Sequence, residues 1–213
     1  MTPAAHPGGP ERRHHGNRHG RSEEARLAVL EAADDLLVEK GFAGVTMEGI
    51  ASRAGVAKQT IYRWWSTKAD VLMDAFLQDA TEDLTPPDTG DFPADLRAYL
   101  HRLAWFLAES QPGAVFRSLL AQAQHDPVFA EEFRARCLTA QRHRDRALLE
   151  RAVTAGRLPS SLDLDTETDQ LVGPLYYRVL ISPGPIPERF TNALTDAFLQ
   201  RHAAQDLSGR SSS

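Results

Sequence analysis

Cysteine is almost absent from this sequence, which contains one, Cys137, in 213 residues. A single cysteine excludes an internal disulfide and any multi-cysteine metal cage within one chain. Long apolar runs are missing as well, since none approaches the ~20 residues that a membrane-spanning helix needs. Residues 1–22 lack the apolar segment of a secretory signal. We therefore expect a globular protein that stays in the cytoplasm and has no membrane partner.

The common signatures of catalysis are missing too. The chain has no G-x-S-x-G elbow, no H-E-x-x-H helix and no glycine-rich phosphate loop. His125 and Asp126 are neighbours in "QHDP", but adjacent residues diverge on a helix, and a helix cap explains Asp126 better. We expect no enzymatic activity, no cofactor and no metal site.

Acidic residues are absent from one stretch, although the whole chain carries a net charge of −5. In residues 49–69 the charged side chains are Arg53, Lys58, Arg63 and Lys68. A basic surface on an acidic body is typical of a small nucleic-acid-binding module joined to a larger domain.

Strand-like alternation is lacking over any useful length, and helical spacing replaces it. Apolar residues recur every three or four positions from Ser22, which we expect to cap the first helix, to Gly41, which ends it. Two short helices follow around Gly55, and a fourth begins near Thr67. Beyond them, one long helix is expected from about residue 128 to 155. We predict an all-α fold with about nine helices.

Composition divides the chain into four parts. Residues 1–21 are rich in Gly, Pro, His and Arg and are expected to form a disordered basic arm. Residues 22–68 form an N-terminal three-helix unit, and residues 69–205 form a larger helical bundle. Residues 206–213 are expected to be a disordered tail.

The three-helix unit contains "TMEGIASRAGVAKQTIYRWWSTKADVL", from Thr46 to Leu72, which reads as two short helices joined by a tight turn. Ala51 is small enough for a close helix crossing, and Gly55 tolerates the positive φ of the turn. Residues of types that contact phosphates and base edges then cover the outer face of the second helix. The alternative is a plain helical hairpin whose charges are merely solvated.

Residues 26–72 resemble the N-terminal domain of TetR/AcrR transcriptional regulators, with "AVLEAADDLLVEKGFAGVTMEGIASRAGVAKQTIYRWWSTKADVL" carrying the likeness. The later "GPLYYRVL" resembles a segment of some TetR C-terminal domains. Ala57 and Trp64 depart from the family, which often has Ser or Thr and His there, so the operator sequence cannot be inferred. Together with the outer face of the helix, the resemblance implies DNA contacts from Thr46, Lys58, Gln59, Thr60, Tyr62, Arg63, Trp64 and Lys68.

In that family the rest of the chain binds a ligand and forms a dimer. The aromatic side chains of the predicted bundle, residues 69–205, are candidates for lining a pocket, although aromatic side chains at helical spacing more often belong to the core. Arg144 either reaches the surface or faces inward toward an acidic group or an anionic ligand. Cys137 is either core or a ligand contact. The candidate pocket residues are Trp105, Phe106, Phe116, Phe129, Phe133, Cys137, Arg144, Tyr176 and Tyr177.

The last two helices carry more apolar surface than a terminal hairpin needs for its own core. A four-helix dimer interface would bury this surface, whereas burial within one chain is the alternative. The candidate interface residues are Leu171, Leu175, Leu180, Phe190, Leu194 and Phe198.

The interpretation is a ligand-responsive repressor that binds a palindromic operator as a homodimer and is released by a small molecule. Its partners would be double-stranded DNA, a second copy of the chain and an unidentified effector, and the DNA-bound protein would lie in the nucleoid. The alternative is a TetR-like activator, or a regulator without a small-molecule effector.

Overall fold

The computed structural model describes residues 16–182, 184 and 186–210. In these ranges the regular elements are all helical, and α7, the π-helical turn η1 and α8 continue into one another, which leaves nine separate helices as predicted. The elements are α1 (Gly16–Gly44), α2 (Met47–Ala54), α3 (Lys58–Trp64), α4 (Lys68–Asp83), α5 (Phe92–Glu109), α6 (Gln111–Ala123), α7 (Pro127–Phe133), η1 (Arg134–Leu138), α8 (Thr139–Thr154), α9 (Leu164–Leu180) and α10 (Glu188–Arg210).

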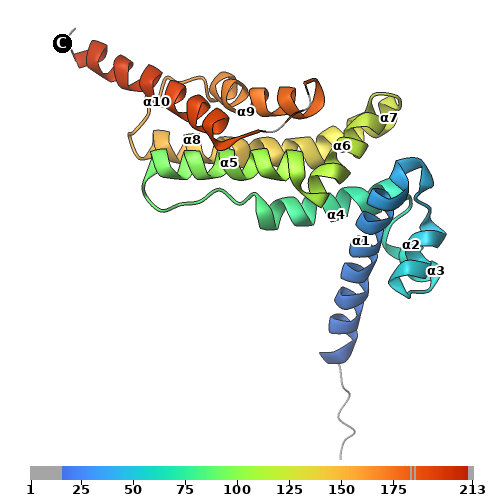
Figure 1. The fold of residues 1–213 in the computed structure, drawn as a ribbon. Coiled ribbons are helices and arrows are strands. Elements are labelled where there is room, and N and C mark those ends of the chain that lie inside the picture. The colour runs from blue at the N-terminus through green and yellow to red at the C-terminus, as the bar shows by residue number, and fades with distance from the viewer. Residues whose placement is uncertain (1–15, 183, 185, 211–213) are drawn as a thin grey trace, which may run out of the picture.

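The helices form a small unit at one end of a larger bundle (Figure 1). The small unit consists of α1, α2 and α3, and α4 leads from it into the body of the molecule. In the body, α10 packs on α5, and α9 packs on α8 and α5. Helix α6 contacts α1, α4 and α5, so it joins the small unit to the bundle.

Two predicted boundaries are wrong. Ser22 does not cap the first helix, because α1 already begins at Gly16 and so includes the end of the expected arm. Once a helix is nucleated, each further polar residue adds one backbone hydrogen bond without needing apolar burial. Similarly, α10 continues to Arg210, into the expected tail. Residues 1–15 and 211–213, the remainder of the predicted arm and tail, lie outside the described residues.

The predicted break at Gly41 and the predicted start and end of α2 are confirmed. Gly41 breaks the helical path of α1 with a φ of 66°. Thr46 caps α2, with its Oγ1 accepting a hydrogen bond from the Gly49 N–H at 3.0 Å. Gly55 ends α2 with a φ of 65°, in the left-handed region that favours glycine. Ala57 precedes α3 without a side-chain cap, as its missing hydroxyl implies.

The bundle contains one very close backbone approach, between α5 and α6. A Cβ on Gly113 would lie 2.0 Å from the carbonyl oxygen of Phe106, so only glycine fits there. Ser110 holds this corner, because its hydroxyl donates to the Phe106 carbonyl at 2.6 Å and accepts from the Gly113 N–H at 3.0 Å. The N-terminus of α6 is therefore fixed against α5.

Membrane spans and metal clusters are both absent from the described part of the chain. Within it, no helix is long and apolar enough to cross a membrane. The same residues contain no group of three or more His, Cys, Asp or Glu side chains arranged to hold a metal ion.

Candidate nucleic-acid interface

Helix α3 presents one exposed polar face and one buried apolar face. Ile61 is 1% exposed and Trp65, which follows the helix, is 4% exposed, so both anchor α3 to the core as predicted. Of the predicted contact residues on α3, Thr60 and Trp64 are half-buried, and the exposed ones are Lys58, Gln59, Tyr62 and Arg63. Four of the side chains predicted to contact DNA therefore lie together on the outer face of α3.

Lys58 is held by an acidic neighbour on α2. Its Nζ lies 2.5 Å from Oε1 of Glu48, and this hydrogen bond raises the pKa of the lysine. The ammonium also lies 5.6 Å from the centre of the Tyr62 ring. Both partners of the ion pair are exposed, and such pairs contribute little in water. A phosphate can therefore replace Glu48 as the partner of Lys58.

Arg63 offers the freest positive charge on this face, because it forms no ion pair with any residue that the structure describes. Its guanidinium lies 5.3 Å from the centre of the Trp64 ring, which in turn meets Trp65 edge-to-face with ring centres 5.5 Å apart. A guanidinium with its donors unpaired suits both phosphates and the acceptor edge of guanine.

Lys68 has a structural role that the sequence did not reveal. Its Nζ donates to the carbonyl oxygens of Phe42 at 2.6 Å and Val45 at 3.0 Å, and it lies 4.5 Å from the Phe42 ring centre. Burial lowers the pKa of Lys68. Two of its three N–H donors therefore bind the turn between α1 and α2, rather than all pointing toward a phosphate as the resemblance implies.

A polar relay joins the end of α3 to the bundle, and sequence reasoning missed it. The Trp65 indole N–H donates to Oδ2 of Asp74 at 2.7 Å. The other carboxylate oxygen of Asp74 accepts from Arg136, which also bonds Asp70 at 3.2 Å and Glu132 at 3.0 Å. Arg136 belongs to η1, and single π-helical turns are frequent at functional sites. Asp74 and Arg136 are 62 positions apart, so no local signal could join them.

Most of the aromatic residues predicted to line a pocket pack on one another. Phe106, Phe116 and Phe133 are all buried. Phe116 lies at the centre of the cluster, with its ring centre 6.0 Å from those of both Phe133 and Tyr176. Phe129 stacks on Phe133 at 6.0 Å.

Two of the predicted pocket residues lie on the surface. Trp105 is 48% exposed and Tyr177 is 59% exposed, so neither faces the aromatic cluster. Both stand at helical spacing from buried residues, and that spacing does not say which side of a helix faces inward. A pocket role for these two residues therefore gains no support from the aromatic cluster.

Polar side chains enter the bundle beside the aromatic cluster. Arg144 is half-buried and donates two hydrogen bonds, of 2.9 and 3.1 Å, to the Gln141 amide oxygen. Gln141 in turn donates to Asp145 at 2.8 Å, and Asp145 also accepts from the Tyr99 hydroxyl at 2.6 Å. Burial raises the pKa of Asp145 to about 6. Arg144 thus faces inward near an acidic group, one of the two arrangements that the sequence left open.

Cys137 is fully buried beside this cluster, and burial raises the pKa of its thiol to about 12. A thiol with such a pKa is not ionised at neutral pH and is therefore unreactive. This fits the expectation of a small core residue.

The predicted dimer residues separate into two groups. Leu171, Leu175 and Phe198 are at most 4% exposed and pack in the chain's own core, which is the alternative that the sequence left open for them. Phe190 and Leu194 are half-buried. The amphipathic pattern marks an apolar face but does not say which chain covers it.

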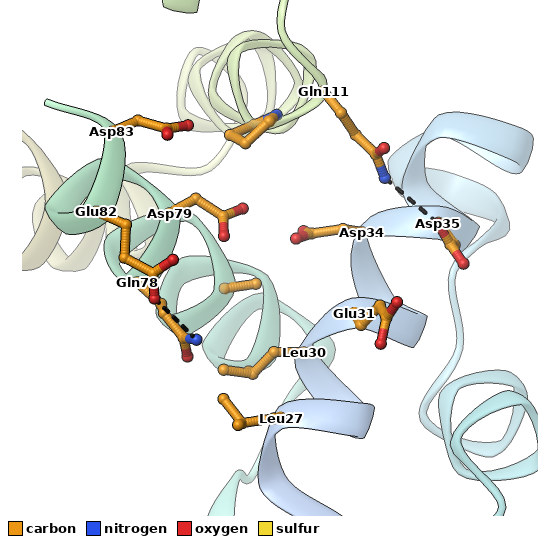
Figure 2. A pocket seen from close by; sticks show the side chains of 12 residues that line it. Leu27, Leu30, Glu31, Asp34, Asp35, Gln78, Asp79, Glu82, Asp83 and Gln111 are labelled. Atoms are coloured by element: carbon orange, nitrogen blue, oxygen red, sulfur yellow. Dashed lines mark hydrogen bonds between the residues drawn. The ribbon is translucent and has the colours of Figure 1, made fainter. Parts of the chain in front are cut away.

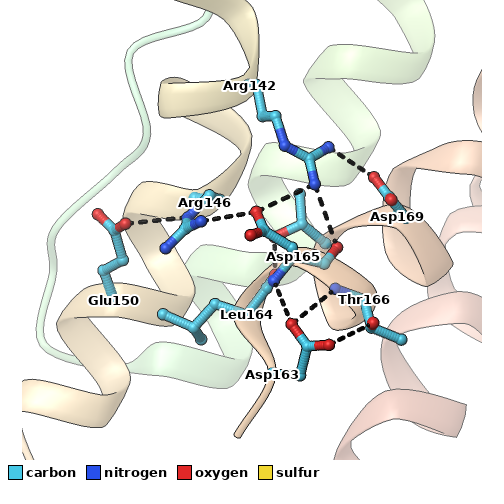
Figure 3. A network of polar contacts seen from close by, with 9 residues as sticks. Arg142, Arg146, Glu150, Asp163, Leu164, Asp165, Thr166 and Asp169 are labelled. Atoms are coloured by element: carbon cyan, nitrogen blue, oxygen red, sulfur yellow. Dashed lines mark hydrogen bonds and ion pairs between the residues drawn. The ribbon is translucent and has the colours of Figure 1, made fainter. Parts of the chain in front are cut away.

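The remaining predicted interface residue, Leu180, belongs to an exposed apolar surface at the end of α9. Tyr177, Leu180 and Ile181 are 59%, 39% and 67% exposed. Next to them is an open groove of about 570 Å³, lined by Arg178, Pro187, Arg189, Phe190 and Ala193. A network of ion pairs fixes the start of the same helix on α8, joining Arg142 to Asp165 and Asp169, and Arg146 to Asp165 and Glu150 (Figure 3).

Two family profiles match the chain. Residues 29–75 match the profile of bacterial regulatory proteins of the tetR family, and residues 86–198 match a tetracyclin repressor-like C-terminal domain. The chain is 42% identical over 174 residues to the uncharacterized HTH-type transcriptional regulator YdeS of Bacillus subtilis (strain 168). The aligned residues cover 82% of this chain and 87% of that protein.

Two further relatives extend the comparison. The DNA-binding transcriptional repressor TetR of Mycobacteroides abscessus is 28% identical over 180 residues, covering 84% of this chain and 94% of that protein. The crystal structure of the TetR family transcription regulator SCO0332 superposes with a TM-score of 0.72 at 32% identity, covering 83% of this chain and 97% of that one. The similarity therefore extends over both the three-helix unit and the helical bundle.

Proposed function

The chain belongs to the TetR family of bacterial transcriptional regulators, and from this premise we propose that it is a ligand-responsive repressor that binds a palindromic operator as a homodimer. The observation that carries the proposal is the outer face of α3, where Gln59, Tyr62 and Arg63 are exposed while Ile61 and Trp65 fix the helix from behind. A regulator that binds chromosomal DNA acts in the nucleoid.

Helix α3 is proposed to enter the major groove. Arg63 and Gln59 are suited to base edges, and Lys58 and Tyr62 are suited to phosphate oxygens. Thr46 and the remaining N–H of Lys68 are proposed to contact the DNA backbone beside the N-termini of α2 and α4. The half-buried Trp64 would present its ring edge to a sugar or a thymine methyl.

The homodimer is proposed to form through the end of α9 and the start of α10. Tyr177, Leu180 and Ile181 are apolar or aromatic side chains that are exposed within residues 177–181, and Phe190 and Leu194 are half-buried on the following helix. Exposed apolar patches of this kind mark interaction surfaces. A two-fold axis at this face would place two copies of α3 to read the two halves of a palindrome.

The ligand response is proposed to act through the aromatic cluster and the relay behind α3. An effector that enters between Phe116, Phe133 and Tyr176 must separate rings that now touch, which would move α7 and η1. Because Arg136 of η1 bonds Asp74, and Asp74 bonds Trp65, this motion would reach the end of α3. The two states would then differ in DNA affinity, which is the requirement for regulation.

The test is selection of fragmented genomic DNA by the purified full-length protein, followed by sequencing. The proposal predicts enrichment of a short palindrome upstream of a few genes, and no enrichment by an Arg63→Ala protein that has a wild-type circular dichroism spectrum. Enrichment of fragments without a shared sequence, or equal enrichment by the variant, would contradict it. The genes beside the palindrome then supply effector candidates, and each candidate should lower the DNA affinity.

A further inference from the structure

A second candidate site lies behind the three-helix unit, where α1, α4 and α6 meet (Figure 2). It is an open cavity of about 440 Å³. Helix α1 forms one wall, α4 forms the opposite wall, and the N-terminus of α6 closes one end. Its lining residues are Leu27, Leu30, Glu31, Asp34, Asp35, Ala75, Gln78, Asp79, Glu82, Asp83, Gln111 and Pro112.

The charge in this cavity is of one sign. Half of the lining side chains are carboxylates, and no lysine, arginine or histidine is among them. Two arginines near the cavity bond mainly to other groups. Arg53 lies 3.7 Å from Asp35 but forms its shorter bonds to Glu39. Arg102 donates only to the backbone oxygen of Asp83. Within the described ranges, neither Asp34 nor Asp79 forms an ion pair.

Buried acceptor atoms in the cavity are left without a hydrogen-bond donor. Asp34 is 8% exposed, and its Oδ1 has no hydrogen-bond partner among the residues that the structure describes. Its carboxyl group faces that of Asp79 across the cavity (Figure 2). The amide oxygen of Gln78 is likewise buried and unpaired, while the Gln78 NH2 points to Glu82 at 3.5 Å. Reversing the amide would place its oxygen against that carboxylate, so the oxygen keeps its unpaired position on this cavity-lining side chain.

Burial makes this pair of carboxyl groups difficult to ionise. Burial, followed by the charge of Asp79, raises the pKa of Asp34 to about 8. Burial also raises the pKa of Asp79. A proton therefore partly neutralises the pair when nothing else does. A cation with N–H groups would neutralise the pair and satisfy its unpaired oxygens at once.

We propose that this cavity binds a primary organic ammonium ion with an alkyl body. Its N–H groups would donate to Asp34 Oδ1 and the Gln78 amide oxygen, and its chain would lie on Leu27 and Leu30. An ammonium fits better than a bare metal ion for two reasons. The described residues contain no carboxylate group arranged to hold a metal, and the volume exceeds what one ion fills.

An occupant would connect parts of the molecule that move separately in a regulator. Asp34 belongs to the three-helix unit, Asp79 to the connecting helix α4, and Gln111 to the bundle. A bound ammonium would hold α1 toward α4 and so restrict the unit that carries α3. This consequence for DNA affinity rests on the proposed function, whereas the binding itself does not.

The experiment is calorimetric titration of the full-length protein, without DNA and at constant ionic strength, with cadaverine as the probe. Three comparison compounds are pentanediol, which is neutral, tetramethylammonium, which has charge but no N–H, and magnesium chloride. Saturable binding of cadaverine, with clearly weaker binding of all three, is expected. No cadaverine binding, or equal heats from every cation, would overturn the proposal, because the carboxylates would then hold a shared proton or a diffuse ion cloud only.

Two variants locate the binding. Asp34→Asn keeps the shape of the side chain and removes repulsion, so it should fold, and cadaverine should bind about tenfold or more weakly to it. Glu131→Gln makes the matching carboxyl-to-amide change on exposed α7, away from the cavity, and should leave binding unchanged. Equal loss in both variants, or no loss in Asp34→Asn, would refute the assignment. A protein that binds cadaverine but enriches no DNA would contradict the proposed function and leave this site standing.

Discussion

The two sides of the three-helix unit carry opposite charge. On the outer side, α3 presents Lys58 and Arg63, and the acids near it are exposed and replaceable. On the inner side, the cavity between α1 and α4 collects carboxylates, of which Asp34 and Asp79 have no base beside them. The net charge of −5 therefore describes neither surface. A binding partner responds to the local charge, which is set by how the helices pack.

The largest effect is expected from Gly113→Ala, which disturbs the cavity side and not α3. The added Cβ would lie 2.0 Å from the Phe106 carbonyl oxygen, so the N-terminus of α6 must move. The free energy of unfolding should fall by about 3 kcal/mol or more, measured by urea denaturation. Gly173→Ala is the matched control, because its Cβ would meet nothing within 4 Å. Equal stability of the two variants would show that α5 and α6 are not packed this closely.

Arg63→Ala tests the outer side alone. It should weaken operator binding by about 1–3 kcal/mol, roughly fivefold to 150-fold, without changing the thermal midpoint. Fluorescence anisotropy on the selected palindrome measures this, with Arg157→Ala, an exposed arginine of the bundle, as the control. Should both variants bind like the wild type, Arg63 would not belong to the interface.

Asp34→Asn tests the cavity side through the pH dependence of stability. Below about pH 4 Asp34 is protonated in the folded and the unfolded chain; above that, the unfolded chain loses the proton while the folded chain keeps it up to about pH 8. The wild type should therefore lose stability relative to the variant as pH rises through this window. The variant should be about 1–3 kcal/mol more stable at the upper end. A pH-independent difference in urea midpoints would contradict the buried carboxyl pair.

Glu48→Gln is expected to have the smallest effect. It removes the exposed partner of Lys58, at 2.5 Å, and so frees the ammonium for a phosphate. Operator affinity should rise by about 0.3–1 kcal/mol at low salt and less at high salt. Glu131→Gln should leave the affinity unchanged. Weaker binding by Glu48→Gln would mean that the ion pair positions Lys58 rather than competing for it.

Whether a contact could be predicted from the sequence depends on how far apart its two residues are along the chain. The caps of α2 at Thr46 and Gly55 involve neighbours a few positions away, and the sequence predicted both. The inward ammonium of Lys68 bonds residues 23 and 26 positions away. Such contacts depend on how helices pack, and no local pattern encodes them.

A related limit applies to the helical bundle, where the sequence marks apolar faces but not what covers them. Helical spacing showed that Leu171, Leu175 and Phe198 lie on apolar faces, but not that their own chain covers them. For the same reason it could not separate the packed Phe116 from the exposed Trp105. Acidic residues of α1 and α4 were visible in the sequence, but they face each other only because these helices cross.

The central claim is that two copies of α3 read two half-sites, and hydroxyl-radical footprinting of the full-length protein on the selected palindrome tests it most directly. The account predicts two protected patches on one face of the DNA, about one helical turn or ~34 Å apart, that disappear together when Arg63 is replaced by alanine. A single protected patch, or uniform protection unchanged by the substitution, would contradict it.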